Sequence, residues 1–160
     1  MTLDEWNALD AAEAERELRQ VCAAPRWARE VAASRPHPDV VSLQATAEVA
    51  LSDADLDEAM AGHPRIGDGN AGGASRREQS GVAGADPAVL AALADGNRAY
   101  EERFGHVYLV CATGRSAQEL LDILRARLAN DPATERAVAL AELAAINRLR
   151  IARLFAEDAA

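Results

Sequence analysis

The chain has 160 residues, the length of about one domain, and its formal net charge of −9 disfavours binding to the phosphate backbone of nucleic acids. Apolar residues make up 49% of the chain but aromatic residues only 4%. This composition favours a core of Ala, Leu, Val and Ile, and therefore helices. We predict a single compact all-α domain, residues 1–160, of about eight or nine helices.

Helix-start signals divide the first sixty residues into five short helices. Thr2 and Glu5 have the spacing of a capping box, and Asp10 can cap the following helix. The segment 35–38 contains two prolines and must end the third helix. The other helix starts are expected at Pro25, at residue 43 and at Ser52.

A glycine-rich loop, residues 62–73, separates these helices from the second half of the chain. A short helical piece is expected over residues 75–81. A longer helix should begin at Asp86 and end at Phe104, with Gly105 as its C-cap. The last two helices are expected to begin at Ser116 and Asp131.

Residues 107–111 form a continuous apolar run that we predict to be extended and buried. A lone buried strand leaves backbone N–H and C=O groups unpaired, which is costly unless another group accepts or donates. We therefore expect this segment to line a pocket in which a ligand pairs with its backbone.

The N-terminal ten residues are acidic and lack the basic and then apolar build of a signal peptide. No apolar run approaches the ~18 residues that a membrane-spanning helix needs. Cys22 and Cys111 lie far apart and neither forms a CxxC pair, so neither a metal site nor a disulfide is predicted. These features predict a soluble, cytoplasmic protein with no membrane or nucleic-acid partner.

His63 lies where the fifth helix should end, and Pro64 restricts the backbone that follows it. From its surroundings alone it is either a functional histidine or a capping histidine whose cation interacts with the helix dipole. The loop has neither a P-loop nor a GxGxxG pattern. His37 and His106 are interpreted as surface or packing residues, and no pairing of histidines indicates a metal.

Ser75, Glu78 and Gln79 would share one face of a helix, because they are three and four residues apart. A hydroxyl, a carboxylate and an amide on one face could hold a polar heterocycle. The alternative is a solvated helix in which Arg76 and Arg77 offset the charge of Glu78.

Two further residues lie in apolar surroundings. Cys111 is interpreted as a buried hydrophobic residue, because nothing near it in sequence would lower its pKa. Arg150 falls within the apolar stripe of the last helix and could reach inward to an anion, although such arginines usually extend to water. Arg148 should point away from that stripe.

Four ordered motifs resemble the 2-oxo-4-hydroxy-4-carboxy-5-ureidoimidazoline (OHCU) decarboxylase family. They are HPRIG at 63–67, SRREQSG at 75–81, FGHVYLVCA at 104–112 and INRLRI at 146–151. The resemblance implies a carboxy-lyase that acts in urate degradation and converts OHCU to (S)-allantoin and carbon dioxide. It further implies an all-helical homodimer that uses no metal and no organic cofactor.

Carried over by position, the resemblance implies catalytic roles for His63, Glu78 and Arg150, with His63 as the acid/base. The same resemblance implies substrate contacts at Pro64, Ser75, Arg76, Arg77, Gln79, Tyr108, Leu109, Val110, Cys111 and Ala112. Two alternatives remain: a non-catalytic helical adaptor, and an enzyme that transfers a proton on a related hydantoin.

Overall fold

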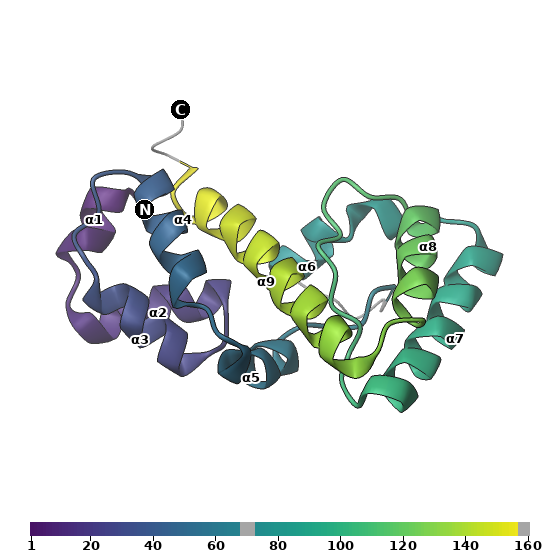
Figure 1. The fold of residues 1–160 in the computed structure, drawn as a ribbon. Helices are drawn as coiled ribbons and strands as arrows, with labels where there is room; N and C mark the ends of the chain where they lie inside the picture. The colour runs from purple at the N-terminus through teal and green to yellow at the C-terminus, as the bar shows by residue number, and fades with distance from the viewer. Residues whose placement is uncertain (68–72, 157–160) are drawn as a thin grey trace. The chain divides into compact units, whose positions relative to one another are not determined.

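The computed structural model describes residues 1–67 and 73–156 (Figure 1). Within these residues the chain forms nine α-helices, two short 3₁₀ helices and no strand, which confirms the predicted all-α fold. No helix in these ranges is both long and apolar enough to cross a membrane. The helices are α1 (Leu3–Ala8), α2 (Ala11–Val21), α3 (Pro25–Ala33), α4 (Val40–Ala50), η1 (Asp53–Asp55), α5 (Leu56–Ala61), α6 (Gly73–Glu78), η2 (Ser80–Val82), α7 (Pro87–Phe104), α8 (Ala117–Arg127) and α9 (Pro132–Leu154).

The chain divides into two compact units. The first comprises Met1–Gly62 and Ala144–Ala160, and the second comprises His63–Leu143. In the first unit, α2 packs against α3 and α3 packs against α4. Trp6 and Trp27 are fully buried there. Their indole N–H groups donate to the carbonyls of Ala14 and Ala47 at 3.2 and 2.8 Å, so each buried ring has its polar atom satisfied.

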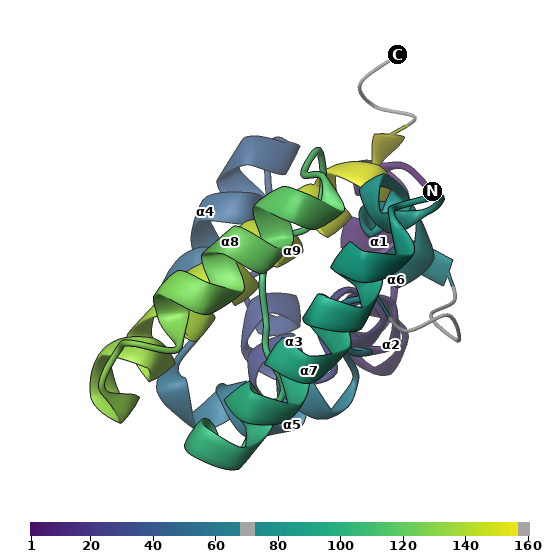
Figure 2. The same cartoon turned by 90° about the vertical axis from the view of Figure 1, so that its right-hand side faces the viewer.

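In the second unit, α7 and α8 run alongside each other (Figures 1 and 2). The two helices approach closely at Gly96, where an added Cβ would lie 2.5 Å from Cδ2 of Leu124. A side chain at this position would require the Leu124 side chain to move, so Gly96 allows Leu124 to pack directly against α7. The core around the crossing includes Leu93, Tyr100 and Leu120, all fully buried.

The predicted caps at Thr2, Asp10 and Ser116 are confirmed, because each side chain accepts a bond from a backbone N–H three residues on. Gly105 ends α7 with φ 75°, as predicted for a glycine C-cap. Three boundaries differ. The piece predicted over 75–81 is α6, Gly73–Glu78, followed by the 3₁₀ helix η2, and the helix predicted to begin at Ser52 starts as the 3₁₀ helix η1 before α5. Helix α4 begins at residue 40 rather than 43. The reason is Asp39, whose Oδ1 accepts from the N–H of Ser42 at 2.7 Å and caps the helix earlier.

Residues 107–112 form neither helix nor strand, whereas the run 107–111 was predicted to be extended and buried. Tyr108, Leu109, Val110 and Ala112 are buried, and Cys111 is half-buried. The segment therefore lies within the second unit without a strand partner among the described residues. Its backbone polar groups must be satisfied by side chains, or by a ligand.

Candidate active site

Residues 63–67 follow α5 and carry His63, which is half-buried. Two side chains from separate helices hold this segment. Nδ2 of Asn97 on α7 donates to the carbonyl of Ile66 at 2.9 Å, and Oε1 of Gln79 accepts from the N–H of Gly67 at 2.9 Å. The backbone that carries His63 is thereby tied to α7 and to the end of α6. Residues 68–72 of the predicted glycine-rich loop lie outside the described residues.

Helix α6 presents one sheltered and one exposed side. Glu78 is buried, with 7% of its surface exposed, and Ser75 is half-buried. Arg76 and Arg77 are exposed. The pattern matches the predicted shared face, since Ser75, Glu78 and Gln79 are three and four residues apart. It does not match the solvated-helix alternative, in which Glu78 would also be exposed.

Gly81, in η2, lies directly against the backbone of residue 115 in the second unit. A Cβ built on Gly81 would lie 2.1 Å from the carbonyl oxygen of Arg115 and 3.0 Å from its carbonyl carbon. Both are backbone atoms, which cannot turn aside as a side chain would. The glycine of the SRREQSG motif is therefore needed for close backbone contact, which holds η2 against residue 115.

The 107–112 segment finds some of its partners within the protein. The carbonyl of Leu109 accepts from Nη1 of Arg127 at 2.7 Å. The hydroxyl of Tyr108 donates to the carbonyl of Leu120 at 3.0 Å. The sequence predicts that a ligand pairs with this backbone. The carbonyl of Leu109 corrects that prediction, because the buried Arg127 already donates to it.

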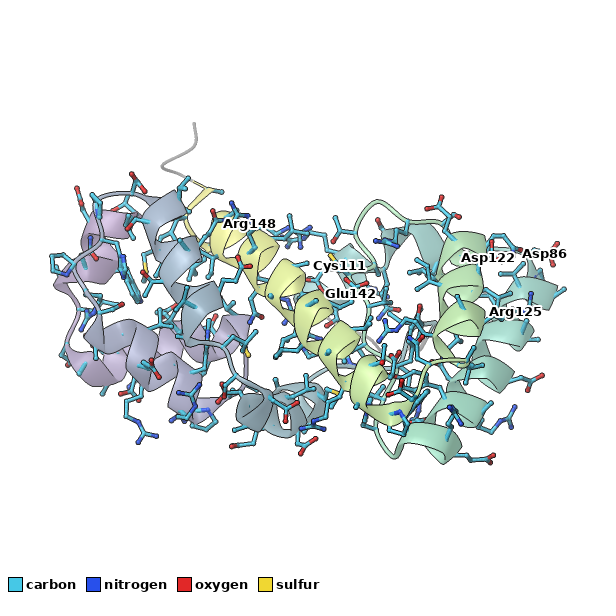
Figure 3. All side chains as sticks on the ribbon, in the orientation of Figure 1. Asp86, Cys111, Asp122, Arg125, Glu142 and Arg148 are labelled. Carbon is cyan, nitrogen blue, oxygen red and sulfur yellow. The ribbon has the colours of Figure 1, made fainter. Side chains whose placement is uncertain are left out.

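Burial and nearby acidic groups together raise the pKa of the Cys111 thiol. Burial raises the pKa of its thiol, the backbone N–H of Thr113 lowers it, and the charges of Glu142 and Glu78 raise it further. Figure 3 shows Cys111 and Glu142 close together within the second unit. Cys111 is half-buried rather than buried as predicted, and the raised pKa of its thiol disfavours the thiolate that a nucleophile needs. The influence of Glu78 also indicates that α6 and the 107–112 segment are within electrostatic reach of each other.

Arg150 lies on the part of α9 that belongs to the first unit. Its side chain is half-buried, and Nη1 donates to the carbonyl of Val21 at 3.0 Å. Arg148 is 52% exposed and lies 3.8 Å from Glu48, so it points away from the core as predicted. Arg150 thus has the inward position that the apolar stripe indicated, while a site shared with His63 stays a prediction.

The other two histidines pack as expected. His37 is buried, its Nε2 lies 2.9 Å from Oγ of Ser34, and burial lowers its pKa. His106 packs edge-on against Tyr100 and stacks with Phe104. Among the residues that the structure describes, no three His, Cys, Asp or Glu side chains are grouped so that they could hold a metal ion.

Three buried polar residues near these elements were not predicted. Asn97, Arg127 and Glu135 occupy core positions of α7, α8 and α9 and are almost wholly buried. The sequence pattern could have indicated the burial of each of these residues. Asn97 lies between Leu93 and Tyr100 at helical spacing, and Arg127 and Glu135 occupy core positions of similar apolar stripes. A polar residue in such a stripe indicates a buried hydrogen-bond partner.

Comparison with known proteins adds an independent result. The family model described as OHCU decarboxylase matches residues 7–152. The chain is 28% identical over 156 residues to the uric acid degradation bifunctional protein TTL of Arabidopsis thaliana, covering 91% of this chain and 48% of that protein. It is 37% identical over 73 residues to a 2-oxo-4-hydroxy-4-carboxy-5-ureidoimidazoline decarboxylase of Amia calva, covering 46% of this chain and 42% of that protein. The chain spans about half the length of these curated relatives.

Solved structures show the same fold. A crystal structure of an OHCU decarboxylase in the presence of (S)-allantoin superposes with a TM-score of 0.79 and 30% sequence identity, covering 88% of this chain and 97% of that one. A crystal structure of an (S)-allantoin synthase superposes with a TM-score of 0.73 at 18% identity, covering 96% of this chain and 54% of that one. The second likeness is evidence for the fold alone.

Proposed function

Because the chain belongs to the OHCU decarboxylase family, we propose that it converts OHCU to (S)-allantoin and carbon dioxide without a cofactor. The observation that carries this proposal is the family match over residues 7–152, which includes every residue of the candidate site. Two features of the second unit support it: the segment that carries His63 is tethered at Gly67, and Glu78 is buried.

The proposed reaction breaks the bond between a ring carbon and the carboxylate. Carbon dioxide leaves, and the electron pair passes into the conjugated ring of the substrate. A proton then adds to the carbon that bears the ureido group, and the face from which it adds sets the S configuration. Fixed donors near the ring oxygens would stabilise the negative charge that develops there.

His63 would deliver that proton. An imidazole changes protonation state near neutral pH, and a well-placed acid or base of this kind contributes ~10² to 10⁴ in rate. The bonds from Asn97 to Ile66 and from Gln79 to Gly67 limit how far the backbone of His63 can move. Glu78, the last residue of α6, would orient His63 or accept from N–H groups of the ureido chain.

The structure sharpens the role of Gln79. Its Oε1 already accepts from the N–H of Gly67, which fixes which end of the amide faces that segment. The other end carries Nε2, which is a donor only. We therefore propose that Gln79 donates from Nε2 to a carbonyl oxygen of the ring.

The cationic guanidinium of Arg150 would donate hydrogen bonds to the leaving carboxylate or to a ring oxygen. The remaining substrate contacts are proposed at Pro64, Ser75, Arg76, Arg77 and residues 108–112. Within that segment Leu109 would use its N–H, because its carbonyl already accepts from Arg127. We also propose that the protein acts in the cytoplasm as a homodimer. Light scattering of the purified chain would test whether it is a dimer.

The function is tested by generating OHCU in place with urate oxidase and the hydrolase that follows it. Appearance of (S)-allantoin is monitored by circular dichroism with and without the purified chain. The proposal requires a faster appearance than the spontaneous reaction gives. An unchanged rate with folded protein would refute it.

The roles are tested with His63→Asn and Glu78→Gln. Each should lower kcat by ~10² or more while the far-ultraviolet spectrum stays helical. His106→Asn is the matched control, because it removes a half-buried histidine of the same unit whose ring packs against Tyr100 and Phe104 and whose Nδ1 lies 3.1 Å from the carbonyl oxygen of Val107. Equal losses in His63→Asn and His106→Asn would remove His63 from the proton step.

A further inference from the structure

The core of the second unit contains a buried ion pair that the proposed chemistry does not use. The side chain of Arg127 is 6% exposed and that of Glu135 is 0% exposed. Nε of Arg127 donates to Oε1 of Glu135 at 2.6 Å, and Nη2 approaches the same oxygen. The hydroxyl of Tyr100 donates to that oxygen at 2.6 Å, and Nδ2 of Asn130 donates to Oε2 at 3.0 Å.

Stability alone does not account for such a pair. Removing two charges from water is costly, and buried pairs can often be replaced by apolar residues of similar volume without loss of stability. An apolar pair cannot, however, supply a directional donor. Arg127 does so with Nη1, which lies 2.7 Å from the carbonyl of Leu109.

Leu109 belongs to the 107–112 segment, which has no helix or strand bonds to fix its backbone. Arg127 constrains two consecutive residues of this segment. It binds the carbonyl of Leu109, and its guanidinium lies 5.0 Å from the ring centre of Tyr108. Glu135 in turn determines the orientation of the guanidinium, because it accepts from Nε while Nη1 faces Leu109.

We propose that Arg127, oriented by Glu135, is a positioning residue that fixes the backbone of residues 108–112 for contact with the substrate. The inference rests on the proposed function, in which that backbone faces the ring. Arg127 itself touches no reacting atom in this account. Its effect passes through the carbonyl of Leu109 and the ring of Tyr108.

The decisive variant removes the three buried polar side chains Tyr100, Arg127 and Glu135 together and leaves only the partly buried Asn130 of this cluster. Tyr100→Phe, Arg127→Met and Glu135→Leu together leave no unpaired charge and no unpaired tyrosine hydroxyl, so the fold should be retained. The carbonyl of Leu109 nevertheless loses its donor. Tyr100→Phe alone is the matched control, because it removes one bond of the same cluster and leaves the bond from Arg127 to Leu109 in place.

Two measurements are made on the folded, full-length variants. In the coupled assay, the triple variant should lose about ten- to hundred-fold in kcat/KM, with KM raised, since small displacements of contact groups have effects of this size. Tyr100→Phe should stay within about threefold of wild type, because it moves no group of the segment. Arg127→Lys, which keeps a cation able to reach Leu109, should recover part of the loss.

Amide hydrogen exchange provides the second readout. Exchange of the amides at residues 108–112 should become at least about tenfold faster in the triple variant and stay unchanged in Tyr100→Phe, since exchange reports local opening. Equal exchange and equal kcat/KM in both folded variants would overturn the inference. If wild type lacks activity, the proposed function fails, and exchange still decides whether Arg127 holds the segment. If the triple variant does not fold, the double variant Arg127→Met with Glu135→Leu, which also removes the donor to Leu109 and leaves no unpaired charge, is compared with Tyr100→Phe by the same measurements, and no difference between them would overturn the inference.

Discussion

Replacing Gly81 by alanine places a methyl group against the backbone of residue 115. The added Cβ would lie 2.1 Å from the carbonyl oxygen of Arg115. Ordinary contacts between heavy atoms lie near about 3.5 Å, so the two backbone segments must separate by roughly 1.4 Å. Neither segment can relieve the contact by turning a side chain. We expect the substitution to destabilise the protein by about 2–3 kcal/mol, the upper part of the range for overpacking.

For a chain of this length, that loss corresponds to a decrease in Tm of roughly 4–12 °C. Activity should fall more than stability alone explains, because Gly81 lies three residues after Glu78 and two after Gln79. Gly84→Ala is the matched control: its φ is 74°, which strains any side chain, but nothing lies within 4 Å of the added Cβ. It should cost about 1 kcal/mol and leave kcat/KM unchanged. A Gly81→Ala protein that melts within 2 °C of wild type, with ~2 °C being the smallest shift expected per kcal/mol, would refute this reasoning.

Three smaller predictions concern other contacts. Burial raises the pKa of Asp55, but bonds from Arg26 and Ser52 outweigh it and hold the pKa below 3.8. The stability that ionised Asp55 contributes is therefore complete above pH 3.8 and lost as the pH falls below it. Asp55→Asn should lower Tm at neutral pH and much less in acid. Equal decreases in Tm at the two pH values would contradict this. The raised pKa of Cys111 predicts slow alkylation by iodoacetamide at neutral pH and fast alkylation in denaturant, and equal rates would show that the thiol is accessible. Asn97→Ala removes the hydrogen bond to the carbonyl of Ile66 that holds the His63 segment. It should lower kcat/KM about tenfold, and an unchanged kcat/KM would contradict this.

The local features of the fold could be predicted from the sequence because their partners are a few residues away. Thr2 binds the N–H of Glu5, and Ser116 binds the N–H of Glu119, so the residue type and the spacing suffice. Gly105 has the positive φ that ends a helix, which glycine alone adopts without strain. The same reasoning missed the cap at Asp39, although Asp39 is a residue type that caps helices and it binds the N–H of Ser42 three residues on.

The long-range contacts of the site could not be predicted in this way. The 107–112 run showed that backbone groups needed partners, but not that Arg127, 18 residues from Leu109, supplies one. Glu78 could equally have been solvated, since Arg76 and Arg77 precede it. Its burial depends on how α6 meets the second unit, which spacing within one helix does not determine.

The most direct test of the proposed activity is the configuration of the product. Allantoin is collected from the coupled reaction in the absence of the chain, in its presence, and with His63→Asn, and the two enantiomers are separated on a chiral column. The account predicts a strong excess of the S form with wild type only, because one face of the ring receives the proton. A racemic product formed at the spontaneous rate in the presence of folded wild-type protein would contradict it.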